Sequence, residues 1–304
     1  MECPNFLSKP ILPGHTIVTC TMNRNDNLLK AVDSWIKLPI QEIIIVDWSS
    51  DQSTNNILRS NGLLDKRIIV VEVKSEQFWN LTQAFNLGFK FVNYSHIIKA
   101  DADVLISPNF FELNTLIDNS FLRGNWKAAK DKEQVHLNGF FYIKTSDLQK
   151  VNGFNEHIRN YGYDDADLYE RLKFKGLDCD HIEPDSLLHL FHDDSSRGNC
   201  LSPDLKFMHY KLRSNLSFLI LYNRYLSMLM PSWTIKSIPQ VFEIIYETDN
   251  YYRVQKVQED KDTLFLSIRK DAYKYALLKY LSWTHGNKVY DYSPSKINAV
   301  LDSL

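Results

Sequence analysis

The sequence predicts an α/β protein with a mainly parallel sheet flanked by helices, followed by a helical C-terminal appendage. Short apolar runs alternate with segments of helical periodicity over residues 16–191, which is typical of βαβ units. Polar residues follow these apolar runs directly, as they do at the strand ends of an open α/β sheet. Beyond about residue 204, aromatic and aliphatic residues recur at helical spacing, so helices are expected to dominate there.

The first half of the chain is expected to hold four strands and two helices. Residues 16–21 and the continuous apolar run 42–46 predict buried parallel strands. Between them we expect a helix, capped by Asn25 or Asp26. Its apolar residues fall on one helical face: Leu28, Leu29, Val32, Trp35 and Ile36. A strand at 67–73, a helix at 81–92 and a strand at 96–100 complete this half.

The second half is more irregular. A helix after Pro108, a strand at 140–143 and a loop at 151–156 are expected. We assign residues 1–203 to one domain, with one half at about 15–110 and the other at about 111–203, and residues 204–304 to a helical region of unknown role. Its stretch 216–230 is shorter than the ~20 residues that cross a bilayer. Its aromatic residues are expected in a core, and an oligomer contact or a membrane-surface contact stays open.

Composition excludes several classes of protein. The 304 residues are 44% hydrophobic and 24% charged, as in an ordinary globular protein. Because 35 basic and 37 acidic residues nearly balance, nucleic-acid binding is not expected. The four cysteines lack paired metal spacing, which favours a reducing compartment. The first residues lack the apolar core of a signal peptide, so we expect a cytoplasmic protein.

The triplet Asp-Ala-Asp occurs twice, in different surroundings. Asp101 and Asp103 follow an apolar run, so their carboxylates lie at a strand end and supply hard oxygen ligands for Mn²⁺ or Mg²⁺. His189 and His192 follow a later predicted strand and are candidate nitrogen ligands, although joint ligation requires a bend between them. The second triplet begins at Asp165 and opens a helix, where it suits hydroxyl groups or structure.

Two ordered sets of segments carry a family resemblance. Residues 19–23, 46–51, 80, 86–88 and 101–103 resemble the nucleotide-sugar half of glycosyltransferases with the GT-A (Rossmann-like) fold. Residues 138–141, 152–154 and 161–168 resemble the acceptor segment of β-1,4-galactosyltransferases and related family-2-type enzymes. The resemblance covers residues 16–197.

The resemblance implies a role for each matching residue. The donor UDP-sugar is assigned to Thr21, Asn23, Asp47, Ser49, Asn80 and Asp101. The metal, Mn²⁺ or Mg²⁺, is assigned to Asp103, His192 and His189. Asp165 matches the catalytic base, and the acceptor is assigned to Asp164, Asp167 and Tyr163.

Three residues depart from the family pattern. Tyr163 replaces a glycine, Ala166 replaces an acceptor-binding carboxylate, and Phe85 stands where many family-2 enzymes carry arginine. The acceptor of the galactosyltransferases is therefore not transferred to this chain. For the base there are two opposing effects: a helix N-terminus lowers a carboxyl pKa, whereas crowding among carboxylates raises it.

The expected function is a metal-dependent, inverting transfer of a sugar from a UDP-sugar to a glycan or glycolipid. A membrane-linked acceptor would place the protein at the cytoplasmic membrane face, and the C-terminal helices are a candidate homo-oligomer contact. A nucleotidyltransferase is an alternative, but it would normally carry a glycine-rich phosphate loop, which residues 22–25 lack. A catalytically silent sugar-binding or scaffold protein is the other alternative.

Overall fold

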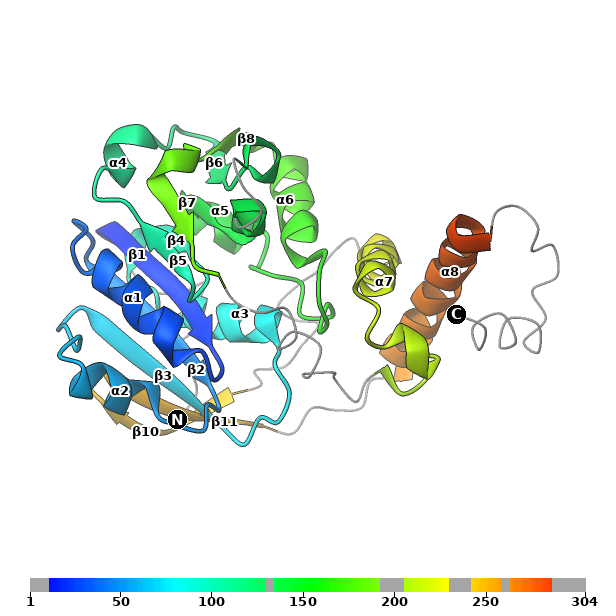
Figure 1. Ribbon diagram of the computed structural model, residues 1–304, viewed down its shortest axis with the longest axis horizontal. Coiled ribbons are helices and arrows are strands. Elements are labelled where there is room, and N and C mark those ends of the chain that lie inside the picture. The colour runs from blue at the N-terminus through cyan, green and yellow to red at the C-terminus, as the bar shows by residue number, and fades with distance from the viewer. Residues whose placement is uncertain (1–10, 130–133, 192–204, 230–241, 258–262, 286–304) are drawn as a thin grey trace.

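One large sheet organises most of the chain in the computed structural model, which describes residues 11–129, 134–191, 205–229, 242–257 and 263–285 (Figure 1). Within these residues nine strands pair in the order β10-β11-β3-β2-β1-β4-β7-β6-β8. Their bounds are β1 (Leu12–Thr21), β2 (Glu42–Trp48), β3 (Ile68–Lys74), β4 (Tyr94–Lys99), β6 (Ser120–Arg123), β7 (Phe141–Lys144), β8 (Asp178–His181), β10 (Phe242–Thr248) and β11 (Tyr251–Lys256). A second, two-stranded sheet consists of β5 (Val104–Ile106) and β9 (Leu187–His189).

The centre of the large sheet is parallel, as the sequence predicts. Strand β1 pairs in parallel with β2 and β4, and β2 with β3. All seven residues of β2 are buried, because helices cover both faces of a parallel sheet. The register places Thr21 opposite Asp47. The polar residues that follow β1, β2 and β4 therefore lie at one edge of the sheet.

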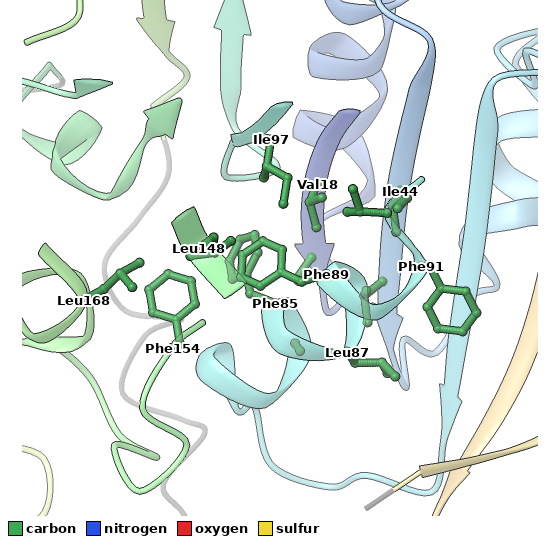
Figure 2. Packing of buried hydrophobic residues seen from close by; sticks show 14 of the residues in the cluster. Val18, Ile44, Phe85, Leu87, Phe89, Phe91, Ile97, Leu148, Phe154 and Leu168 are labelled. Carbon is green, nitrogen blue, oxygen red and sulfur yellow. The ribbon is translucent and has the colours of Figure 1, made fainter. Parts of the chain in front are cut away.

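Helices pack on both faces of this sheet. They are α1 (Asn25–Trp35), α2 (Thr54–Ser60), α3 (Leu81–Phe91), α4 (Phe110–Leu113), α5 (Thr145–Lys150) and α6 (Asp164–Phe174). One core joins α3 with residues of α5 and α6 (Figure 2). A separate core joins α1 with residues of α2 and α4. In α3, a Cβ at Gly88 would lie 2.7 Å from a methyl group of Val18, so glycine permits close packing of this helix on β1.

One expected detail of α1 is wrong. The helix begins at Asn25, and its N-cap residue is Arg24, which makes no side-chain capping bond. Neither Asn25 nor Asp26 caps it.

The second half of the domain is antiparallel where it meets the first. Strand β7 pairs antiparallel with β4 and with β6, and β8 pairs in parallel with β6. Helix α6 follows the loop after α5 (Figure 1), and its Asp165 lies close to Lys99 at the end of β4. This arrangement brings the start of α6 towards the polar residues after β4.

The C-terminal region contains helices and, in addition, a hairpin that the sequence analysis did not anticipate. Helices α7 (Leu216–Leu229) and α8 (Thr263–His285) pack together around a core of their own. Strands β10 and β11 form an antiparallel hairpin, and β11 extends the large sheet by pairing in parallel with β3. Arg253 fixes this pairing, since its Nε lies 2.9 Å from Oε2 of the buried Glu72. Among the described helices, none has the length and apolarity to cross a membrane.

Candidate active site

The loops after β1 and β2 form one end of the site. The Asn23 side chain accepts a hydrogen bond from the Asp51 amide at 2.8 Å, and the Asn23 amide donates to Ser50 Oγ at 3.0 Å. The two loops are thus tied to each other through Asn23. Thr21 is buried at the end of β1, and among the described residues its hydroxyl has no hydrogen-bond partner.

Asp47 and Ser49, both assigned to the nucleotide, also hold their own loop in shape. The carboxylate of Asp47 accepts hydrogen bonds from the amides of Ser50 and Thr54, at 2.9 and 3.0 Å. The Ser49 hydroxyl donates to the Val73 carbonyl at 3.0 Å and accepts from the Glu76 amide at 2.9 Å. These contacts position a polar rim at the ends of β2 and β3.

Asn80 and Asn86 lie on or before α3. Asn80 is the N-cap of the helix, because its Oδ1 accepts a hydrogen bond from the Gln83 amide at 3.2 Å. Asn86 exchanges two hydrogen bonds of 2.8 Å with the backbone of Phe154. Gly153 has φ +65°, and a Cβ there would lie 2.4 Å from Asn86 Oδ1. Asn86 therefore joins the donor half to the loop of the acceptor half.

Asp103 and His189 meet through the small sheet. Val104 pairs with His189 in the β5–β9 register, and the Leu190 amide donates to the Asp103 carbonyl at 2.7 Å. This pairing places His189 Nε2 3.7 Å from Asp103 Oδ1. The other oxygen, Oδ2, lies 3.4 Å from Nη1 of Arg24, which the sequence analysis did not identify.

This pair fits two ligands of one divalent cation. Two ligand atoms with bonds of about 2.1 Å to the same metal lie on the order of 3 to 4 Å apart. A carboxylate oxygen with an imidazole nitrogen is a donor set that Mn²⁺ accepts. Within the described part of the chain, no group of three metal-binding side chains forms. His192, the other predicted ligand, lies outside the described residues.

A lysine links the end of β4 to the start of α6. Lys99, the last residue of β4, has a fully buried side chain whose ammonium lies 2.8 Å from Asp101 Oδ1. The same ammonium lies 4.6 Å from the centroid of the Phe85 ring. A Cβ built at Gly139 would lie 3.0 Å from Lys99 Nζ and 3.0 Å from Asp165 Oδ2. The side chains of Asp101, Lys99 and Asp165 thus meet beside Gly139, where a larger residue would crowd them.

The start of α6 presents two carboxylates with perturbed acidity. Helix α6 begins at Asp164, and its N-cap residue, Tyr163, makes no side-chain capping bond. Burial raises the pKa of Asp164, and the adjacent Asp165 raises it further. Burial also raises the pKa of Asp165, and the Lys99 ammonium opposes this rise. The net shift of both carboxyls is a raised pKa, so the pair is more basic than ordinary carboxylates.

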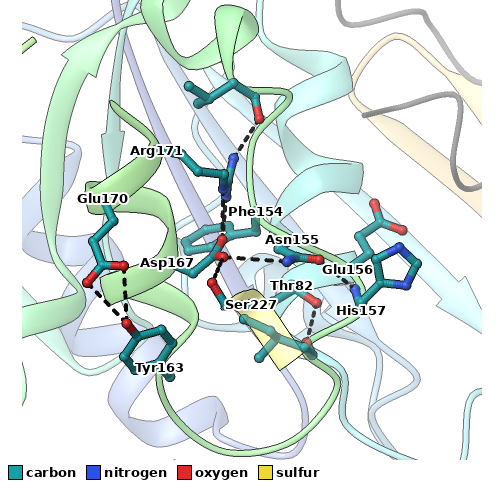
Figure 3. A network of polar contacts seen from close by, with 12 residues as sticks. Thr82, Phe154, Asn155, Glu156, His157, Tyr163, Asp167, Glu170, Arg171 and Ser227 are labelled. Atoms are coloured by element: carbon teal, nitrogen blue, oxygen red, sulfur yellow. Dashed lines mark hydrogen bonds and ion pairs between the residues drawn. The ribbon is translucent and has the colours of Figure 1, made fainter. Parts of the chain in front are cut away.

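Asp167 points to a different set of partners (Figure 3). One of its oxygens lies 2.8 Å from both Nε and Nη2 of Arg171 on the same helix. The other oxygen accepts a hydrogen bond of 2.6 Å from the Ser227 hydroxyl on α7. These contacts join α6 to α7, whereas the predicted acceptor contact of Asp167 stays a prediction.

The loop before α6 is held from the C-terminal region. The buried Asn223 of α7 donates from Nδ2 to the carbonyls of Asn160, Tyr161 and Gly162, at 3.3, 3.1 and 2.7 Å. Tyr163 follows with φ +68°, and its hydroxyl donates to Glu170 at 3.0 Å. Helix α7 therefore supports the loop that leads to Asp164 and Asp165.

The predicted residues therefore fall into separate groups. Asp101 and Asp165 meet beside Gly139, and the small sheet brings together Asp103 and His189. Thr21, Asn23, Asp47 and Ser49 lie at the neighbouring strand ends, and Asn80 lies at the start of α3. Sequence reasoning missed Lys99, although a lysine inside an otherwise apolar strand was a visible signal.

Two family models match adjoining parts of the chain. Residues 16–114 match Glycosyl transferase family 2, and residues 128–193 match the N-terminal domain of galactosyltransferase. No curated protein matches the chain in sequence.

Solved structures with the same fold include β-1,4-galactosyltransferase 7 from Drosophila, in two complexes. One holds manganese, UDP-Gal and xylobiose and superposes with a TM-score of 0.51 at 13% identity, covering 85% of this chain and 99% of that one. The catalytic domain with xylobiose gives a TM-score of 0.50, with the same identity and coverage. The fold is thus that of the GT-A enzymes, as the sequence predicts.

Proposed function

We propose that this chain, a glycosyltransferase with the GT-A fold, transfers a hexose from a UDP-sugar to a hydroxyl group of a glycan with inversion. The observation that carries the proposal is the meeting of Asp101 and Asp165 beside Gly139. There the donor-side Asp101 and the acceptor-side Asp165 approach a common point, at 3.4 and 3.0 Å. A displacement at a sugar carbon requires donor and acceptor groups on either side of one small volume.

Asp165 is the proposed general base. In the transfer, the acceptor oxygen bonds to the anomeric carbon, the bond from that carbon to UDP breaks, and the hydroxyl proton passes to a carboxylate. Among the described residues, none donates a hydrogen bond to the buried Oδ1 of Asp165. A carboxylate with a raised pKa and an available oxygen suits this role.

Asp103 and His189 are the proposed metal ligands, with His192 as a further one. A divalent cation held there would neutralise charge that develops on the leaving diphosphate. The structure of the galactosyltransferase of the same fold holds manganese and UDP-Gal. Mn²⁺ and UDP-galactose are therefore the metal and the donor to test first on this chain. The strand-end residues Thr21, Asp47 and Ser49 are proposed to hold the nucleotide, and Tyr163 and Asp164 the acceptor.

The test is UDP release from UDP-galactose, UDP-glucose and UDP-N-acetylglucosamine with MnCl₂ and a panel of glycans, with the product anomer read by NMR. We expect Asp165→Asn to lower kcat by about 10²-fold to 10⁴-fold, because the base is lost, and to leave UDP binding intact. Asp178→Asn, at an exposed carboxylate of β8, is the matched control. Absence of UDP binding and of turnover with every donor would refute the proposal.

A parallel reaction with UTP and sugar 1-phosphates separates transfer from nucleotidyl transfer. Formation of UDP-sugar in that reaction would favour the nucleotidyltransferase. UDP binding without transfer to any glycan would favour the silent sugar-binding protein.

A further inference from the structure

Lys99 is a buried cation that none of the assignments above uses. Its side chain is 1% exposed, and its ammonium lies over the ring of Phe85, a residue of the core that joins α3 with α5 and α6. An ammonium group in such a place is strongly unfavourable unless carboxylates and an aromatic ring compensate it. Because burying this ammonium is costly, we expect the positive charge of Lys99 to have a function at its buried position.

The surroundings of Lys99 supply that compensation from two directions. Asp101 binds the ammonium directly at 2.8 Å, and the Phe85 ring lies beneath it. Asp165 approaches from α6. Because Lys99 Nζ and Asp165 Oδ2 each lie 3.0 Å from the same point, they are separated by at most twice that distance.

We propose that Lys99 is a positioning residue that keeps Asp165 ionised and holds Asp101 beside it, so that the base is ready when an acceptor hydroxyl arrives. This inference rests on the proposed role of Asp165 as the base. Without a cation, burial and the nearby carboxylates would favour the protonated form of Asp165, which accepts no proton.

The charged and titratable groups around Asp165 support this role. Lys99 comes from β4 and Arg123 from β6, and both lower the pKa of Asp165, whereas burial and Asp101 raise it. Asp164 and Tyr169 are the titratable neighbours on α6 itself. The carboxylates raise the pKa of Lys99 despite its burial, so it stays charged and is not itself a base.

A structural ion pair alone is the competing explanation. The side chain of Asp101 is 33% exposed, so water can solvate it if Lys99 is removed. A cation that served only to neutralise Asp101 could therefore do so from an exposed position. Only the approach to Asp165 requires the ammonium to be inside.

The test is Lys99→Met, which keeps the length of the side chain and removes its charge. Because the side chain of Asp101 is 33% exposed, water can replace the ammonium as its partner, so we expect the fold to survive; thermal unfolding checks this. Lys144→Met is the control, since Lys144 pairs with the exposed Asp118 and not with Asp101 or Asp165. Titration of ¹³C-carboxyl aspartate by NMR, with Asp165 assigned through Asp165→Asn, measures the charge state without substrate.

We expect the Asp165 signal to titrate at higher pH in Lys99→Met and to be unchanged in Lys144→Met. With an active donor and acceptor pair, kcat of Lys99→Met at pH 7 should fall about tenfold or more and recover towards the parent at higher pH. An unchanged Asp165 titration would overturn the inference. A parent protein that transfers no sugar would refute the proposed function instead, and the NMR result would still decide whether Lys99 controls the charge of Asp165.

Discussion

Asn223→Ala should weaken the use of acceptor and leave nucleotide binding intact. Asn223 lies on α7, outside the residues that match either family model. Its side chain is fully buried and donates to three consecutive carbonyls of the loop that leads to Asp164 and Asp165. Alanine removes these donors and leaves the loop without support from α7.

The magnitude follows from the hydrogen bonds that are lost. A buried polar group that loses its partner costs about 1 to 3 kcal/mol. If the whole of this cost appears in acceptor use, kcat/KM for the acceptor falls about 5-fold to 150-fold. The same loss should lower Tm by a few degrees.

Three measurements check this prediction. They are kcat/KM for the acceptor at saturating donor, UDP affinity by calorimetry with MnCl₂, and amide hydrogen exchange of residues 160–163. Met228→Ala, at an exposed position of the same helix, is the control. Equal losses of UDP affinity and acceptor use would refute the reasoning, as would unchanged exchange of the loop amides.

Three further predictions concern charge. Asp103→Asn should abolish the rise in Tm that MnCl₂ causes in the parent, because a proposed ligand is lost; differential scanning fluorimetry with and without EDTA checks this. Burial raises the pKa of Asp164, so the folded state binds its proton more tightly than the unfolded state and stability falls as pH rises from about 4 through neutral pH. Asp164→Asn should therefore raise Tm at pH 8 and have little effect at pH 4. Arg171→Met leaves the buried Asp167 without its cation, and denaturant unfolding should show a loss of about 3 to 5 kcal/mol.

Local patterns were sufficient to predict the parallel centre of the sheet. The run 42–46 is apolar throughout because β2 is buried on both faces, and the alternation of strand and helix fixes the pairing with β1 and β3. The hairpin at 242–256 also left a signal, since Asp249 and Asn250 separate two β-rich runs. Its pairing with β3 could not be predicted, because it depends on contacts such as Arg253 with Glu72 across most of the chain.

The sequence predicted the site residues that directly follow strands, but not the contacts that depend on how distant segments pair. Asp101 and Asp103 come directly after β4, so their position follows from the apolar run alone. The approach of His189 to Asp103 depends on the pairing of β5 with β9. Each of these strands has only three residues, which is too short to show an alternating pattern in the sequence. The support of the acceptor loop by Asn223 is equally non-local, since it joins residues more than 60 positions apart.

Tyr163 occupies a backbone conformation that favours glycine. Its φ is +68°, in the left-handed region that glycine adopts freely, and glycine is the residue that the galactosyltransferase pattern of the sequence analysis has at this position. A side chain in that conformation costs about 1 to 2 kcal/mol. The hydrogen bonds to Glu170 and the support of the loop by Asn223 offset this cost. Because Tyr163 directly precedes Asp164 and Asp165, we expect its ring to form part of the surface that the proposed acceptor meets.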